Sequence, residues 1–463
     1  MTTDLLPRQD PQSAAGESDA LGQALSERYR CPRSFFNFDL RGPLSSEETC
    51  FRFGPGTTCF GRTREGGPST GYDALSDVQV HDGRVSLPFN PGEIIDNLRL
   101  ERYARHGTQG DEFLYSTLRR LYYLVRPLTT LALRKQIQKF HARSGRMRTF
   151  PKWPVDSSVE DISERLLLLS MEAKGVDKVP FIWFWPDGAK SCLMMTHDVE
   201  NAAGTDYCAE LMDLDDSFGI KASFEIVPEE RYSVPDSLLA SLRERGFEIV
   251  IQDLNHDGRL FDDKKEFLRR AKIINRYAQQ YGARGFRAAV LYRRPEWYEA
   301  FEFAFDMSIP NVAHLDPQRG GCCTVMPYFI GDILELPLTT VQDYTLFHIL
   351  NEYSINLWKT QLDRIIAKNG LASFIVHPDY VIEPEARRVY LELLGHLREL
   401  RRQAGLWCAL PSEIETWWRD RSKMSLVADG SGWRIEGKGS ERSVVAYAKR
   451  VDGNLIYEVA WPQ

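Results

Sequence analysis

Between residues 179 and 421 the sequence alternates between short apolar segments and longer amphipathic ones. The short segments are typical of buried strands, and the longer ones carry apolar residues at helical spacing and several stop at a glycine. Repeated strand and helix units predict a parallel sheet, either closed into a barrel or doubly wound. Strands are expected at 179–185, 191–198, 222–228, 247–253, 285–291, 333–338, 373–378 and 407–411, and helices at 202–219, 236–246, 262–282, 351–370, 383–405 and 412–421.

The flanking regions follow other patterns. Residues 1–30 are rich in small and polar residues and are expected to be a disordered lead-in. The range 31–178 begins with short aromatic runs between Gly and Pro clusters, which predict a small β-rich segment, and continues with helical patterns. The barrel domain is expected at 179–422. Short strand patterns with Gly turns at 423–463 predict a small β appendage.

Composition limits the class of protein. The chain has 463 residues, of which 43% are hydrophobic and 27% charged, as in a soluble globular protein. A net charge of -7 argues against general binding of nucleic acids, which requires a positive surface. No apolar run approaches the length of a membrane span, and the N-terminal residues do not resemble a secretory signal. We therefore expect a cytoplasmic location.

One basic stretch departs from this acidic composition. Residues 113–155 contain ten Lys or Arg residues and no acidic residue. Such a stretch could form a face for an anionic membrane surface, an acidic polysaccharide or a partner protein. The alternative, which we favour, is a solvated helix flank balanced by acids elsewhere in the fold.

The segment Ser191 to Glu200 combines an apolar strand with a polar end. Alternation along a strand places His197 on one face and both Asp198 and Glu200 on the other. In α/β folds the carboxyl ends of strands are where catalytic residues usually lie. Two carboxylates facing one small volume share a proton, hold a metal, or divide the roles of base and ligand.

Other predicted strands also end in polar residues. Gln252 and His256 follow one strand, Arg287 ends the next, and His377 ends a later one. Carboxylates, histidines and an arginine that converge at one barrel mouth form the kind of site found in hydrolases and metalloenzymes.

These motifs resemble those of the polysaccharide deacetylase (NodB-homology) family over about residues 193–413. The segment THDVE resembles its first motif, QDLNH the second, GFRAAV the third and FIVHP the last. The resemblance implies an irregular (β/α) barrel that removes acetyl groups from amino sugars with a divalent metal. It implies Asp198 as catalytic base, Arg287 as the residue that orients this carboxylate, and His377 as general acid.

The resemblance also implies metal ligands. Glu200 and His256 match ligand positions, and Gln252 stands where the family has a first histidine ligand. An amide oxygen is a weaker zinc ligand than an imidazole. Ala289 and Val290 replace the Pro and Tyr of the third motif. The expected metal is zinc, with cobalt or nickel as alternatives, and the metal could be lost altogether.

Three functions remain open from the sequence. The first is a metal-dependent deacetylase that acts on an N-acetylated glycan or its precursor. The second is a catalytically silent barrel that binds carbohydrate in polysaccharide assembly, with Gln252 marking a lost metal. The third is a hydrolase of another C–N bond. Each candidate also has a structural alternative: His197 could be a hydrogen-bonded core residue, and His256 could shape a turn before Gly258.

Overall fold

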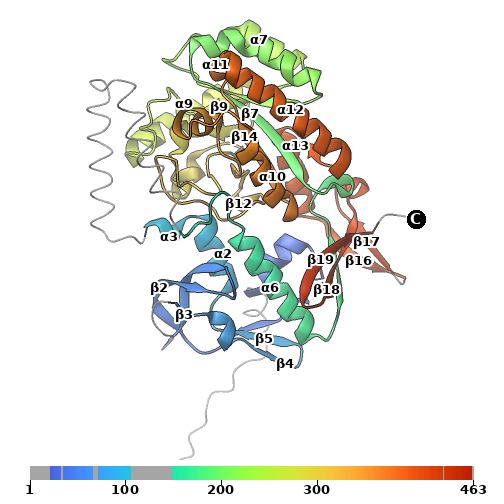
Figure 1. The fold of residues 1–463 in the computed structure, drawn as a ribbon. Helices are drawn as coiled ribbons and strands as arrows, with labels where there is room; N and C mark the ends of the chain where they lie inside the picture. The colour runs from blue at the N-terminus through green and yellow to red at the C-terminus, as the bar shows by residue number, and fades with distance from the viewer. Residues whose placement is uncertain (1–20, 33–34, 66–70, 106–148, 431, 461–463) are drawn as a thin grey trace, which may run out of the picture. The chain divides into compact units, whose positions relative to one another are not determined.

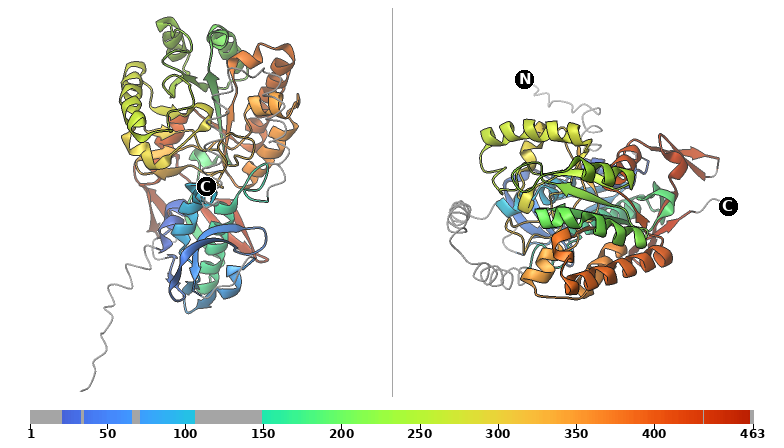
Figure 2. Two further views of the ribbon diagram at one scale, coloured as in Figure 1. Left: turned by 90° about the vertical axis from the view of Figure 1, so that its left-hand side faces the viewer. Right: turned by 90° about the horizontal axis from the view of Figure 1, so that it is seen from above.

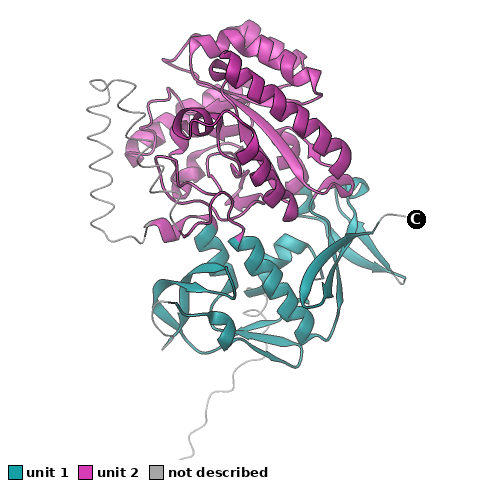
Figure 3. Ribbon diagram, viewed as in Figure 1, with its two compact units in different colours: residues 1–98, 158–184, 420–463 teal, residues 99–157, 185–419 magenta. Residues whose placement is uncertain are grey.

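The computed structural model describes residues 21–32, 35–65, 71–105, 149–430 and 432–460. The described residues within 1–98, 158–184 and 420–463 form one compact unit, and those within 99–157 and 185–419 form another (Figure 3). Of the basic range 113–155, only 149–155 falls within the described residues. Residues 21–29, expected to belong to a disordered lead-in, form a helix, because Leu21, Leu25 and Tyr29 recur at four-residue spacing and are buried.

The first unit contains small sheets and the helix α6. The predicted β-rich segment is present as two sheets, in which β5 lies between β1 and β4, and β2 pairs with β3. A third sheet has the order β19-β18-β6, and β16 pairs with β17. The elements are β1 (Phe38–Leu40), β2 (Leu44–Arg52), β3 (Thr58–Arg64), β4 (Gln79–His81), β5 (Arg84–Leu87), α2 (Pro91–Arg99), α6 (Ser158–Ala173), β6 (Lys178–Ile182), β16 (Ser425–Asp429), β17 (Gly432–Glu436), β18 (Val445–Val451) and β19 (Asn454–Val459).

Strand β6 differs from the sequence expectation. We expected residues 179–185 to be the first strand of the parallel sheet, but β6 pairs antiparallel with β18, with Val179 opposite Ala448. Its apolar side chains join an aromatic cluster in which the rings of Phe181 and Tyr457 are 5.4 Å apart. A short apolar run does not specify its pairing partner, and here that partner lies near the end of the chain.

The second unit is an α/β fold around a curled sheet (Figure 1). The sheet has nine strands in the order β12-β13-β11-β10-β9-β8-β7-β14, with β15 also paired to β7. Except for the antiparallel pair β12 and β13, neighbouring strands are parallel. This confirms the predicted α/β fold, and in Figure 2 the helices of this unit lie around the outside of the sheet.

The strands and helices of this unit follow the predicted alternation, but β11 and β12 are additional short strands, and the strand expected at 285–291 ends at Arg287 and is followed by a 3-10 turn at 289–291. The strands are β7 (Cys192–Val199), β8 (Ala222–Ile226), β9 (Glu248–Gln252), β10 (Gly285–Arg287), β11 (Phe305–Asp306), β12 (Tyr328–Ile330), β13 (Ile333–Glu335), β14 (Leu371–Ile375) and β15 (Trp407–Cys408). The α-helices are α3 (Arg102–Arg105), α7 (Ala202–Ser217), α8 (Asp236–Glu244), α9 (Lys264–Tyr281), α10 (Asn356–Ala367), α11 (Pro378–Val381), α12 (Pro384–Ala404) and α13 (Pro411–Arg421). None of the described helices of the chain combines the length and apolar character needed to cross a membrane.

Side-chain hydrogen bonds join β14 to the segment that follows β13. The Ser373 hydroxyl donates to the carbonyl of Pro337 (2.8 Å) and accepts from the amide of Thr339 (3.2 Å). The Thr339 hydroxyl accepts from the Ser373 amide (3.0 Å) and donates to the carbonyl of Leu371 (2.7 Å). These contacts join β14, one edge of the curled sheet, to the segment after β13, the strand next to the other edge, so the fold approaches a barrel although β13 and β14 do not pair as strands.

Candidate active site

The central strand β7 delivers the two carboxylates. All its residues are buried, and it lies between β14 on one side and β15 and β8 on the other. The strand ends at Val199, so Asp198 lies at its carboxyl end and Glu200 just beyond it. Gln252 ends β9, Arg287 ends β10, and His377 follows β14. The parallel strands therefore bring the predicted residues to one edge of the sheet.

Asp198 is held by two neighbours. The Nη1 atom of Arg287 donates to its Oδ1 at 3.0 Å, and the Nε2 atom of Gln252 donates to its Oδ2 at 3.0 Å. Burial raises the pKa of Asp198, and Arg287 and His377 only partly oppose this effect. Both carboxylate oxygens thus have fixed directions, and the group is a stronger base than an exposed aspartate once it is ionised.

Two imidazoles lie close to the same carboxylate oxygen of Glu200. The Nε2 atom of His256 lies 2.8 Å from its Oε1, and the Nε2 atom of His377 lies 3.5 Å from the same oxygen. Burial alone would raise the pKa of Glu200, but His256 and His377 hold it well below its usual value. Glu200 is therefore an anion placed between two nitrogen ligands or cations.

His377 has a carboxylate partner that sequence reasoning did not assign to it. Its Nδ1 atom lies 2.6 Å from Oδ1 of Asp343, and its backbone amide donates to Oδ2 of the same carboxylate at 2.7 Å. Burial alone would lower the pKa of His377, but Asp343 and Glu200 raise it well above its usual value.

His197 lies on the other face of β7, as strand alternation predicts. Its Nε2 atom is 2.8 Å from Oδ2 of Asp215, and its Nδ1 atom is 3.0 Å from the carbonyl oxygen of Val376. Tyr390 donates to the other oxygen of Asp215. The ring is fully buried, so His197 is a hydrogen-bonded core residue that contacts the backbone next to His377.

The loop after β9 holds His256 in an unusual backbone conformation. Asp253 and His256 both have positive φ, 53° and 54° respectively, a region that non-glycine residues rarely adopt. Asp and His are among the non-glycine residues that adopt this region most readily, and here it turns the loop so that His256 lies next to Glu200. The neighbouring Asp257 does not face Glu200; its two oxygens pair with Arg270 at 2.9 and 2.8 Å.

The residues present fit a divalent cation, but in an arrangement that differs from the expected one. Ligand atoms of Asp198, Glu200 and His377 all lie within 4.8 Å of one another. Carboxylate oxygens and imidazole nitrogens are the ligand types that zinc takes in proteins. The expected ligand set was Glu200, His256 and Gln252, so the geometry adds His377 and Asp198 as candidate ligands.

Gln252 is the residue that fits a metal least well. Its Nε2 atom donates to both carboxylates, at 3.0 Å to Asp198 and 3.2 Å to Glu200, so it presents N–H groups to the site and no ligand atom. Its buried Oε1 atom has no hydrogen-bond partner within the described residues. Gln252 could act as a ligand only if its amide turned over to present this oxygen.

Solved structures of other proteins resemble about half of this chain. A protein from Mycobacterium smegmatis assigned as a polysaccharide deacetylase has 18% sequence identity and a TM-score of 0.43, over 51% of this chain and 93% of that chain. Puue allantoinase has 13% identity and a TM-score of 0.41, over 51% and 92%. A Pseudomonas aeruginosa protein assigned as a polysaccharide deacetylase has 12% identity and a TM-score of 0.39, over 51% and 93%. No protein-family model and no curated protein matches the sequence.

Proposed function

We propose that the chain is a divergent polysaccharide deacetylase, a hydrolase that removes N-acetyl groups from an amino sugar of a polysaccharide or its precursor. The observation that carries this proposal is the arrangement of two oppositely charged pairs around Glu200. Arg287 holds Asp198 on one side, and Asp343 holds His377 on the other. A carboxylate base and an imidazolium acid are thereby fixed on either side of one small volume.

Asp198 acts as the general base in this proposal. Arg287 and Gln252 fix the two carboxylate oxygens, so the base is oriented before a water molecule binds. Asp198 accepts the proton of that water as it attacks the acetamide carbonyl. The attack produces a tetrahedral intermediate whose C–N bond must then break.

His377 acts as the general acid. Asp343 fixes Nδ1, which leaves Nε2 as the ring atom directed towards Glu200 and the site. Asp343 and Glu200 raise the pKa of the ring well above its usual value, which favours the protonated form that can donate a proton to the leaving amine. Protonation of that nitrogen is what allows the amine to leave.

Glu200 and His256 are the proposed metal ligands, with zinc, cobalt or nickel as the cation. A bound divalent cation would supply Lewis acidity for the acetamide carbonyl. The alternative ligand set of Asp198, Glu200 and His377 would remove both the base and the acid from proton transfer. The metal content of two variants distinguishes the two ligand sets. If Glu200 and His256 are the ligands, His256→Ala should lose the metal and His377→Ala should retain it. The reverse result would support the alternative set.

A second function is favoured by Gln252. Because its amide bridges Asp198 and Glu200, the two carboxylates are satisfied without a cation, as expected for a catalytically silent carbohydrate-binding barrel or for hydrolysis of another C–N bond. The deciding experiment is an assay for acetate released from N-acetylated oligosaccharides, with added zinc and with a chelator. Acetate release that the chelator abolishes supports the deacetylase. Glycan binding without release supports the silent barrel.

A further inference from the structure

Two buried carboxyl groups lie side by side on the neighbouring strands β11 and β13. Asp306 is opposite Glu335 in the register of these parallel strands, and the two residues are 1% and 0% exposed. Two carboxylates so placed would repel each other, and each would lack the solvation that water gives an ion. A single proton shared between the two groups removes the repulsion.

The hydrogen bonds around the pair indicate which group carries the proton. Asp306 accepts twice from Ser308, at Oδ1 from the hydroxyl (2.7 Å) and at Oδ2 from the amide (3.1 Å). Glu335 accepts at Oε1 from the amide of Ile309 (2.9 Å), and its buried Oε2 accepts from no donor within the described residues. Burial, the charge of Asp306 and a hydrogen bond to Asp306 raise the pKa of Glu335 well above its usual value. The proton therefore belongs on Glu335.

The other ionisable groups around the pair do not provide a balancing positive charge. Tyr298, in the 3-10 helix Pro295–Ala300, hydrogen-bonds to the first carboxyl, and Tyr328 on β12 is opposite the second. Burial raises the pKa of both phenols well above its usual value, so both keep their protons. Arg293 opposes the raised pKa of the second carboxyl, but its guanidinium is already paired with Glu101. The shared proton is therefore what neutralises the pair.

The residues that follow the first carboxyl on β11 hold the end of β10. The hydroxyl of Ser308, which donates to the pair, accepts from the amide of Ala288 at 2.8 Å. Ala288 directly follows Arg287, whose Nη1 atom donates to Asp198. The Nη2 atom of Arg287 donates to Sδ of Met307 at 3.8 Å. The position of Arg287 thus depends on the position of β11.

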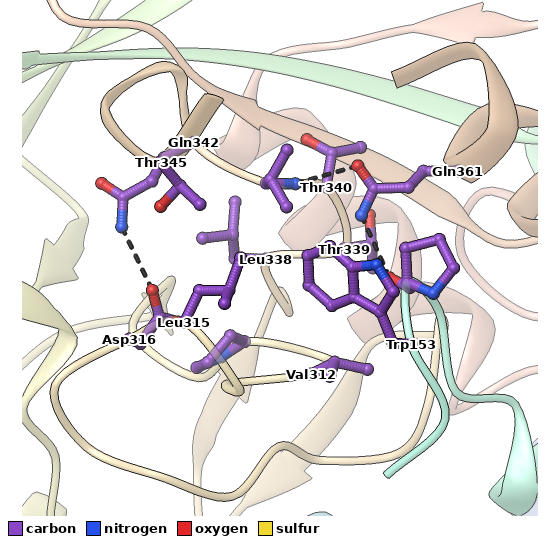
Figure 4. A pocket seen from close by; sticks show the side chains of 13 residues that line it. Trp153, Val312, Leu315, Asp316, Leu338, Thr339, Thr340, Gln342, Thr345 and Gln361 are labelled. Atoms are coloured by element: carbon purple, nitrogen blue, oxygen red, sulfur yellow. Dashed lines mark hydrogen bonds between the residues drawn. The ribbon is translucent and has the colours of Figure 1, made fainter. Parts of the chain in front are cut away.

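Strands β11 and β13 remain joined beyond the two carboxyl groups. The amide of Leu338 donates to the carbonyl of Ile309 at 3.0 Å, and the amide of Asn311 donates to the carbonyl of Leu338 at 2.7 Å. The two segments continue from there to line the pocket drawn in Figure 4, with Leu315 and Leu338 both in its lining. These contacts all require β11 and β13 to stay together.

We propose that Asp306 and Glu335 share one proton, and that this proton keeps β11 beside β13 so that the pair acts as a positioning device for Arg287. Loss of the proton at alkaline pH leaves two buried anions, which separates the strands and lets Arg287 move away from Asp198. The effect on catalysis rests on the proposed function, in which Arg287 orients the base. The shared proton does not depend on that function.

The pH dependence of denaturant unfolding tests the shared proton without turnover. The folded chain keeps a proton that Glu335 releases on unfolding, so the stability from this proton is complete below about pH 4.5 and is lost as pH rises towards the raised pKa. Glu335→Gln puts a neutral amide in place of the neutral acid and still donates to Asp306. Between about pH 5 and pH 8, the unfolding equilibrium constant should rise about tenfold more per pH unit in the unaltered chain than in Glu335→Gln.

Asp306→Asn is a second variant for the same measurement. Its amide can donate to Glu335, so the proton is no longer needed and the pH slope should fall as it does in Glu335→Gln. Asp332→Asn, which removes an exposed carboxylate between β12 and β13, is the matched control and should keep the slope of the unaltered chain. Equal slopes in the unaltered chain and a folded variant of the pair would overturn the proposal. Failure of both variants to fold would also overturn it, because each keeps a donor between the two side chains.

Acetate release tests the positioning of Arg287. Glu335→Leu removes the donor to Asp306 and should lower kcat about a hundredfold, the scale of a displaced catalytic group, with KM unchanged. Glu335→Gln should restore kcat. Equal kcat in Glu335→Leu and the unaltered chain, or no recovery in Glu335→Gln, would overturn the positioning role. If the unaltered chain releases no acetate but the two pH slopes differ as predicted, the shared proton stands and the deacetylase proposal fails.

Discussion

The Nε2 atom of Gln252 donates to Oδ2 of Asp198 at 3.0 Å. The same atom donates to Glu200, so one neutral amide satisfies two carboxylates that would otherwise repel each other. In the family that the motifs resemble, this position belongs to a histidine ligand. The amide should therefore lower the affinity of the site for a metal, and replacing Gln252 should change that affinity.

Replacing Gln252 by histidine should raise affinity for zinc. The substitution removes the amide N–H groups that bridge Asp198 and Glu200 and supplies an imidazole, which is a stronger ligand than an amide oxygen. Titration with Zn²⁺ followed by calorimetry measures the effect. Gln252→Asn is the control, since it keeps the amide and should not tighten binding. Equal affinity in Gln252→His and the unaltered chain would contradict the assignment of this position to the metal site.

Asp343→Asn should lower turnover about a hundredfold, the scale of one acid–base contribution. The carboxylate is the main group that raises the pKa of His377, so its loss should also move the basic limb of the pH–rate profile to lower pH. Asp236→Asn, which removes an exposed carboxylate at the start of α8, serves as control. An unshifted pH profile with reduced turnover would indicate a structural role for Asp343.

Ser373→Ala should destabilise the second unit by about 1–3 kcal/mol, because it leaves the buried Thr339 amide and Pro337 carbonyl without their partner. Denaturant unfolding measures this loss. Thr360→Ala on the exposed face of α10 removes a local hydrogen bond and should change stability much less. Equal losses for the two substitutions would mean that the side-chain hydrogen bonds between β14 and the segment after β13 add nothing to the free energy of unfolding.

Glu248 should make stability depend on pH. Burial raises its pKa from 4.5 to about 7, so the folded state holds a proton that the unfolded state releases. The contribution of Glu248 is therefore complete below about pH 4.5 and is lost as pH rises through about 7. Unfolding midpoints at pH 5 and pH 8 should show Glu248→Gln gaining stability relative to the unaltered chain at the higher pH. Glu244→Gln, at an exposed site, is the control, and a parallel pH dependence of Glu248→Gln and the unaltered chain would contradict the prediction.

Much of the site could be predicted because it depends on strand ends. Asp198, Gln252 and Arg287 each end an apolar run, and parallel strands bring such ends to one edge whatever the intervening sequence is. The placement of His197 on the opposite face followed from alternation alone, and the structure confirms it.

The contacts made by loops and by distant segments could not be predicted. Asp343 begins a short helical segment, residues 343–349, that the sequence did not predict, so nothing local indicates that its carboxylate turns towards His377. Asp316 and Trp153 line one pocket although they are far apart in the chain. The apolar run of β6 suits a parallel sheet as well as it suits its actual antiparallel pairing with β18.

Acetate release from an N-acetylated oligosaccharide tests most directly whether Asp198 is the base of a deacetylase. The unaltered chain and Asp198→Asn should be compared at equal zinc occupancy, with circular dichroism to confirm the fold of both. We predict acetate together with an equal amount of free amine from the unaltered chain, and none from Asp198→Asn. Comparable acetate from both proteins, or none from the zinc-loaded unaltered chain, would contradict the claim.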